Sequence, residues 1–169
     1  RQALARLARP NREALSLFNA HGEWAGSYLM HRRLADTLRR LGCLDEALQE
    51  AHAARQRYET SDYIEGRVNS ASSLAACLIA FDQADEAIRV LRFALDLLES
   101  TPRRASVQDF LLFARLALAC QLAGKTDLAS EYAHQAWTLV KLLDLQHSYI
   151  EPDTASTIDE LAKAFPAQP

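Results

Sequence analysis

Residues 34–54 read LADTLRRLGCLDEALQEAHAA, and this stretch occurs three times in the chain. Residues 74–94 read LAACLIAFDQADEAIRVLRFA and residues 116–136 read LALACQLAGKTDLASEYAHQA, so the three copies align without a gap. Five columns are identical in all three copies, and successive copies begin 40 and 42 residues apart. Self-similarity at a fixed period of this length is typical of repeat architectures.

Each copy has the pattern of two amphipathic helices joined by a short turn. In the first copy Leu34, Leu38 and Leu41 recur at the spacing of one helix face. Gly42 then predicts a helix stop, because glycine adopts positive φ without a steric clash. Asp45 predicts the cap of a second helix. The apolar stripe of that second helix consists of Ala47, Leu48, Ala51 and Ala54.

The alanines shared by all copies are the most informative residues. Small side chains such as Ala47, Ala87 and Ala129 allow two helix axes to approach to about 8–10 Å. A single hairpin of this kind leaves one apolar face uncovered. We therefore expect neighbouring hairpins to stack, with much of the stability coming from the interfaces between them.

This repeat resembles the tetratricopeptide repeat family. The matching residues are Leu34, Ala35, Leu38, Gly42, Ala47, Ala51 and Ala54, then Leu74, Ala75, Leu78, Ala87, Leu91 and Ala94, then Phe113, Leu116, Ala117, Cys120, Gly124, Ala129, Ala133 and Ala136. Three positions depart from the family pattern: His31 and Ala71 replace the usual large residue, and Asp82 replaces the turn glycine. The period exceeds the family's usual length of about 34 residues. The repeat is therefore most similar to the long-helix variety found in bacterial regulators and signalling proteins.

The resemblance implies an all-α right-handed superhelix of antiparallel helix pairs, a solenoid of about three and a half repeats with a C-terminal capping helix. We expect a single domain over residues 1–169. Its parts are a partial unit at about 1–21, full units at about 24–60, 62–100 and 103–145, and a capping helix at 153–165. A helix break is expected at Pro10-Asn11, and a linker over residues 145–152. Because the sequence begins with Arg1 inside a helical pattern, we expect a fragment of a longer protein.

Composition supports a helical protein and argues against other classes. The chain is 49% apolar and 24% charged, with only 5 Gly and 5 Pro and a formal charge of −3. No apolar run approaches the ~20 residues of a membrane span, and no secretory signal is recognisable. Cys43, Cys77 and Cys120 have no metal-binding spacing, which favours reduced thiols and a cytoplasmic location.

The sequence contains no recognisable catalytic or metal-binding pattern. Zinc-protease, hydrolase, phosphate-loop and calcium-loop motifs are missing. The acidic pairs Asp45-Glu46 and Asp85-Glu86 are explained by their favourable place at a helix start. We therefore expect no enzyme activity, no catalytic residue and no cofactor or metal.

The resemblance also implies where a partner would bind. In this family the first helix of each pair lines a concave groove, and transfer by repeat position gives Arg32, Arg33, Asp36, Arg39, Asn69, Ser72, Ser73 and Arg115. Arg32 and Arg115 match basic positions of the family's clamp for peptide carboxyl ends. Asp36, Ser73 and Leu111 depart from that clamp, so we do not expect a chaperone-tail site.

Two interpretations of these polar residues stay open. Four arginines between Arg32 and Arg40 can form a solvated helix face with internal ion pairs to Asp36, or a site for an acidic peptide. Asn69 suits an extended peptide, because its amide both donates and accepts, but it is equally suited to a solvated surface.

The leading functional hypothesis is a protein-interaction module that binds a peptide or partner segment in its concave groove. The alternative is a domain of a bacterial transcriptional or signalling regulator that senses a small ligand or a peptide. Direct nucleic-acid contact is disfavoured by the acidic balance and by the few aromatic residues. We expect a protein or peptide partner of acidic character and no membrane contact, and a homodimer is compatible with the sequence.

Overall fold

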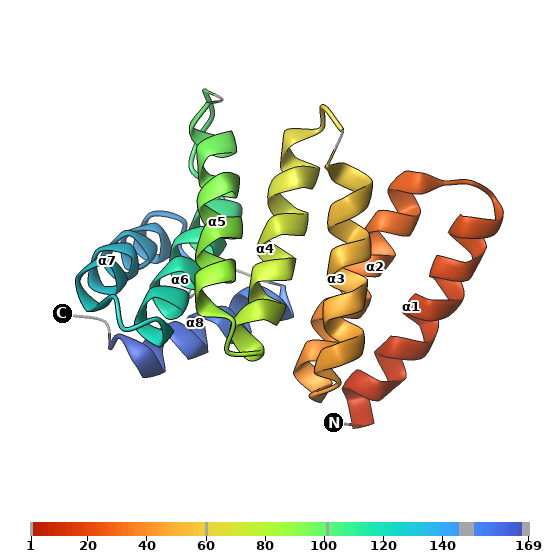
Figure 1. Cartoon of the computed structure of the whole chain (residues 1–169), viewed down its shortest axis with the longest axis horizontal. Helices are drawn as coiled ribbons and strands as arrows, with labels where there is room; N and C mark the ends of the chain where they lie inside the picture. Colours follow the sequence, from red (N-terminus) through yellow and green to blue (C-terminus); the bar gives the residue numbers. More distant parts are fainter. Residues whose placement is uncertain (1, 60, 101, 146–150, 167–169) are drawn as a thin grey trace. The chain divides into compact units, whose positions relative to one another are not determined.

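The computed structural model describes residues 2–59, 61–100, 102–145 and 151–166, with side chains described outside residues 2–7, 24 and 25. Over these residues the chain is all-helical, with eight helices and no strand (Figure 1). The helices are α1 (Gln2–Ala20), α2 (Trp24–Leu41), α3 (Leu44–Tyr58), α4 (Ile64–Ala80), α5 (Ala84–Glu99), α6 (Val107–Leu122), α7 (Thr126–Leu142) and α8 (Pro152–Ala164). The prediction of an all-α chain is confirmed.

The chain divides into two compact units. Unit 1 comprises Arg1–Phe81 and contains α1–α4, and unit 2 comprises Asp82–Pro169 and contains α5–α8. In unit 1 each helix packs against the next along the chain, and α2 also contacts α4. In unit 2 α6 packs against α5, α7 and α8. A single domain over 1–169 and a superhelical arrangement both stay predictions.

The turns of the repeat follow the sequence pattern. Gly42 and Gly124 lie in the turns that follow α2 and α6, with φ of 84° and 71°. Asp82 occupies the matching position of the second copy and also adopts positive φ, at 61°. Aspartate tolerates the left-handed region better than most non-glycine residues, since its short side chain bonds locally. The substitution therefore preserves the turn.

One predicted helix boundary is wrong. Pro10 does not break the chain, because α1 continues through it from Gln2 to Ala20. A proline inside a helix removes one backbone hydrogen bond and kinks the helix, but it does not oblige the helix to end. Along its length α1 packs against α2.

The predicted caps also need correction. Cys43, Gln83 and Lys125 occupy the N-cap positions of α3, α5 and α7, and the shared aspartates lie inside the first turn. Asp45 is one of these first-turn residues. Its carboxylate is close to the positive end of the helix dipole, which accounts for its recurrence without a capping bond.

The shared alanines are at the helix crossings, as their size predicts. Ala47 and Ala87 are fully buried, and Ala129 is 1% exposed. His31, which replaces the usual large residue, is buried as well, and its Nδ1 lies 2.6 Å from Oε2 of Glu50 on α3. A polar contact between His31 and Glu50 therefore joins α2 to α3 at this position.

The start of α4 packs closely onto the end of α3. The rings of Tyr28 and Tyr58 meet edge to face with centroids 3.8 Å apart, and Tyr63 lies 5.9 Å from Tyr58. Gly66 of α4 is buried beneath the Tyr58 ring, which occupies the space that a β-carbon would need. The absence of a side chain at Gly66 is thus required for this aromatic packing.

The C-terminal helix α8 agrees with the predicted capping helix at 153–165, while most of the expected linker lies outside the described residues. Cys77 and Cys120 are buried, Cys43 is exposed, and none of the three forms a disulfide. Among the described helices, none combines the length and the apolar character that a membrane span requires.

Candidate functional site

The first candidate site is the side of α2 that carries Arg33 and contacts α4 through Asp36. Leu34, Ala35 and Leu38 are buried in unit 1, whereas Arg33 and Arg40 are exposed on the opposite side of the helix. This division follows from the helical period, because residues one turn apart share a face. We call Arg32, Arg33, Asp36, Arg39, Asn69 and Ser73 together the α2–α4 face.

Asp36 joins the two helices of this face. The hydroxyl of Ser73 on α4 donates to Oδ1 of Asp36, at 3.0 Å, and Nη1 of Arg32 lies 3.7 Å from Oδ2. The Asp36 and Arg32 side chains are only 13% and 20% exposed. The acid is therefore a structural link between α2 and α4, and it neutralises one arginine of the cluster.

Tyr28 lies beside this link and remains a neutral phenol. Burial raises the pKa of Tyr28 far above its usual range, and the charge of Asp36 adds to the rise, while the neighbouring Arg32 charge partly offsets it. A phenol with a raised pKa gives no anion near neutral pH. The α2–α4 face thus offers hydrogen-bond donors and positive charge rather than a nucleophile.

Arg33 is the most accessible charge of the face. Its side chain is exposed, and its guanidinium makes no hydrogen bond or ion pair with any residue that the structure describes. Arg39 is half-buried one turn beyond Asp36. Asn69 is half-buried one helical turn before Ser73 and so shares its side of α4, whereas Ser72 is buried.

The structure thus places seven of the eight expected residues on α2 and α4, and the eighth elsewhere. Arg115 belongs to α6 in unit 2, is 3% exposed, and donates through Nη2 to Oδ2 of Asp153 on α8, at 2.5 Å. In this arrangement α8 covers Arg115. Sequence reasoning missed the pair because Asp153 follows 38 residues later, and no local pattern connects the two.

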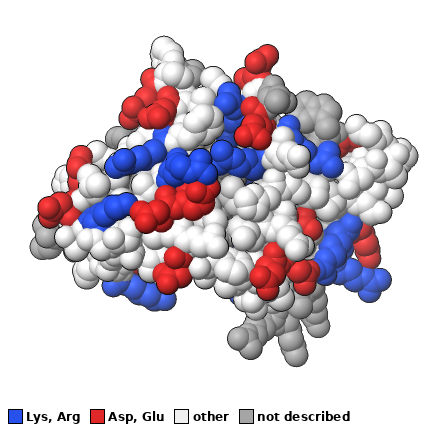
Figure 2. All heavy atoms as spheres, viewed as in Figure 1, with Lys and Arg blue, Asp and Glu red and all other residues white. Residues whose placement is uncertain are grey.

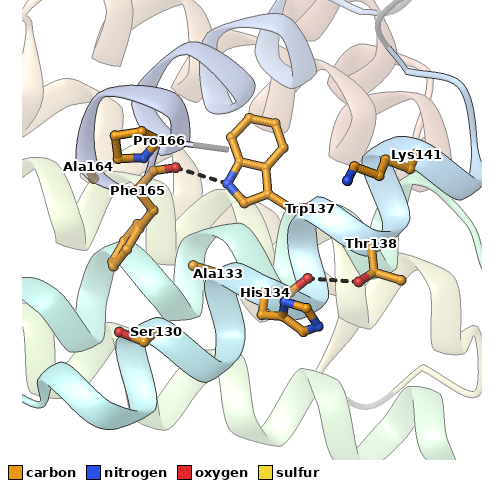
Figure 3. A pocket seen from close by; sticks show the side chains of 9 residues that line it. All are labelled: Ser130, Ala133, His134, Trp137, Thr138, Lys141, Ala164, Phe165 and Pro166. Atoms are coloured by element: carbon orange, nitrogen blue, oxygen red, sulfur yellow. Dashed lines mark hydrogen bonds between the residues drawn. The ribbon is translucent and has the colours of Figure 1, made fainter. Parts of the chain in front are cut away.

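A second candidate site is a groove in unit 2, between α7 and the end of α8 (Figure 3). Its volume is about 610 Å³. The residues that line it are Ser130, Ala133, His134, Trp137, Thr138, Lys141, Ala164, Phe165 and Pro166. This groove is not among the sites that the repeat pattern predicts. The available signal was the spacing of Ser130, His134, Trp137 and Lys141 on one side of a helix.

On the face drawn in Figure 2, several basic side chains lie next to one another, with acidic side chains beside them. Within the described ranges no group of His, Cys, Asp and Glu has the arrangement of a metal site. No protein-family model matches the chain, and no curated protein sequence matches it.

Proposed function

We propose that this protein is an interaction module built from tetratricopeptide-like helix pairs in a right-handed solenoid, and that its α2–α4 face binds an acidic segment of a partner protein. The interaction takes place in the cytoplasm and requires no enzyme activity. Support comes from the internal repeat, from the surplus of arginine on α2, and from a contact inside unit 2 that provides a precedent.

That precedent carries the proposal. Arg33 and Arg115 occupy the same repeat position, directly before the shared Leu34 and Leu116. On α6 the arginine at this position, Arg115, donates a hydrogen bond to Asp153 of the amphipathic helix α8. On α2 the equivalent Arg33 is exposed and has no partner among the described residues. A second acidic helix, supplied by another protein, suits Arg33 in the same way.

The remaining residues of the face favour a protein segment over a simple ion. Asn69 offers both a donor and an acceptor for a peptide backbone, and half-buried Leu29 lies one turn before Arg33. Arg39 and Arg40 extend the positive charge along α2 by another two turns. A partner that combines acidic residues with an apolar stripe matches this surface.

The test uses a fluorescent peptide with the sequence of residues 151–166, EPDTASTIDELAKAFP, added to the full chain and followed by anisotropy. We expect saturable binding that becomes about fivefold weaker with Arg33→Gln in the protein. Replacing the aspartate of the peptide that corresponds to Asp153 by asparagine should weaken binding by a similar factor. Arg57→Gln is the matched control, because Arg57 is an exposed arginine on α3. If Arg33→Gln and Arg57→Gln behave alike, the proposed face is wrong.

The second function expected from the sequence, a ligand-sensing regulatory domain, is favoured by a different observation. Sensing a small ligand requires a concave site, and the groove beside α7 in unit 2 is such a site. The chemistry of this groove is independent of the α2–α4 face.

A further inference from the structure

The groove in unit 2 is built on one side of α7. Ser130, His134, Trp137 and Lys141 follow one another at intervals of four, three and four residues, which places them in a single row along the helix. The opposite wall comes from the end of α8, with Ala164 followed by Phe165 and Pro166. Figure 3 shows these two walls with the Trp137 indole between them.

A hydrogen bond fixes the Trp137 indole. Its Nε1 donates to the backbone oxygen of Phe165, at 2.9 Å, which ties α7 to the residue after α8. Trp137 and Phe165 also pack against the buried core of unit 2. Since the only polar atom of the indole is already engaged, the ring presents an apolar surface to the groove. Together with Ala133 and Pro166 it forms a prearranged apolar wall.

The polar side of the groove is cationic. Lys141 is exposed and extends from α7 toward Trp137 in Figure 3, and His134 lies two turns earlier. Neither the Lys141 ammonium nor the His134 ring has a hydrogen-bond or ion-pair partner among the described residues. No acidic side chain is among the described residues that line the groove. An ammonium beside an apolar wall without a counter-charge is complementary to an anion.

The two sides together restrict the ligand. A neutral apolar molecule leaves the ammonium unused, and inorganic phosphate leaves the apolar wall without contact. A carboxylate joined to an aromatic or aliphatic body uses both. The volume of about 610 Å³ lies within the range of about 300–1,000 Å³ that is usual for sites of small molecules.

We propose that this groove binds a small amphipathic carboxylate, with the carboxylate at Lys141 and the apolar body between Trp137 and Phe165. The hydroxyls of Ser130 and Thr138 also line the groove, and that of Thr138 donates to the backbone oxygen of His134, at 2.9 Å. The site belongs entirely to unit 2, and it does not rest on the interaction function proposed for α2 and α4.

The test measures binding of 4-phenylbutyrate to the full chain by calorimetry and by tryptophan fluorescence. Its neutral analogue, 4-phenylbutyramide, has the same shape without the charge. We expect saturable binding of the acid and about tenfold weaker binding of the amide. Lys141→Gln removes the ammonium and weakens the acid by a similar factor. Lys163→Gln, on an exposed lysine of α8 outside the groove, leaves the affinity unchanged.

Three outcomes overturn the inference. The first is that the acid shows no saturable binding at millimolar concentration. The second is that acid and amide bind equally, or that Lys141→Gln and Lys163→Gln have equal effects. The third concerns an acetylated tetrapeptide with a free C-terminal phenylalanine carboxylate: if this peptide binds and 4-phenylbutyrate does not, the groove accepts a protein terminus instead. Thermal melting of each variant verifies that it is folded, which the exposure of both lysines predicts.

Discussion

At the scale of single residues, Gly66 illustrates how a conformational cost in the sequence permits a contact in the structure. Glycine inside a helix ordinarily costs about 0.5–1 kcal/mol relative to alanine. Here the buried Gly66 on α4 leaves room for the Tyr58 ring, which contacts Tyr28 and Tyr63. The aromatic contacts of unit 1 therefore depend on a residue that contributes no side chain.

We predict that Gly66→Ala destabilises the protein, against the usual trend for glycine within a helix. The new methyl group overlaps the Tyr58 ring, so the ring and its neighbours must shift at a cost of about 1–3 kcal/mol. Urea denaturation followed by circular dichroism measures the difference in the free energy of unfolding.

A second substitution provides the control. In a Tyr58→Leu background the ring nearest to the new methyl group is gone, and only Cδ1 of Tyr63, 2.6 Å from the β-carbon position, still has to shift, so Gly66→Ala costs less than in the parent protein. If the glycine substitution has the same effect in both backgrounds, the two residues are not coupled and the packing described for them is wrong.

At the scale of elements, the start of α6 is held by a polar cluster. Asp109 accepts hydrogen bonds from the backbone N–H and the hydroxyl of Ser106, at 2.8 and 2.9 Å, and pairs with Arg103. Partial burial alone raises the pKa of Asp109, but the bonds from Arg103 and Ser106 outweigh it and hold the pKa below its usual range. The ionised carboxylate therefore stabilises the folded state.

This cluster predicts a pH dependence of stability. Because the folded pKa of Asp109 is depressed, its contribution is complete above the unfolded value of about 3.9 and is lost as the pH falls through the folded pKa. Asp109→Asn should lower the free energy of unfolding at pH 7 by about 1–2 kcal/mol. The difference from the parent protein should shrink below about pH 4.

Asp127→Asn is the matched control for this prediction, since Asp127 is an exposed acid in the first turn of α7. Its loss removes only the interaction with the helix dipole, worth about 0.3–1 kcal/mol. Denaturation curves at pH 7 and at pH 3.5 compare the two variants. A deficit of Asp109→Asn that does not change with pH contradicts the proposed role of its charge.

The helices, their caps and their long-range contacts differ in how well the sequence predicts them. The repeated apolar columns predicted the helices of all three copies, because the 3.6-residue period is a local property of the chain. Caps and breaks were less predictable, since a proline can kink a helix without ending it, and an aspartate at a helix start suits both the cap and the first turn. Contacts such as Arg115 with Asp153, and the groove between α7 and α8, depend on how distant segments pack. No periodic pattern encodes them.

At the scale of the whole molecule, the two proposed binding sites prefer ligands of the same charge, on a protein whose formal charge is −3. The overall charge repels an anionic ligand at long range, so attraction has to come from local positive side chains. At the α2–α4 face this is the exposed Arg33, with the half-buried Arg32 and Arg39 nearby on the same helix, and in the groove Lys141 lies next to an apolar wall. The balance between charge and apolar contact thus differs between the sites.

This difference predicts how the two variants and added salt separate the sites. Arg33→Gln should weaken binding of the acidic peptide and leave binding of 4-phenylbutyrate unaffected, whereas Lys141→Gln should do the reverse, because the two residues belong to different units.

Screening acts within about 10 Å at 0.1 M salt and about 3 Å at 1 M. Raising the salt should therefore weaken the peptide more than 4-phenylbutyrate, whose apolar body remains in contact with Trp137 and Phe165. Anisotropy and calorimetry over a series of sodium chloride concentrations measure both affinities. If either substitution weakens both ligands equally, the peptide and the carboxylate share one site, and the assignment of separate sites to α2–α4 and to α7–α8 is wrong.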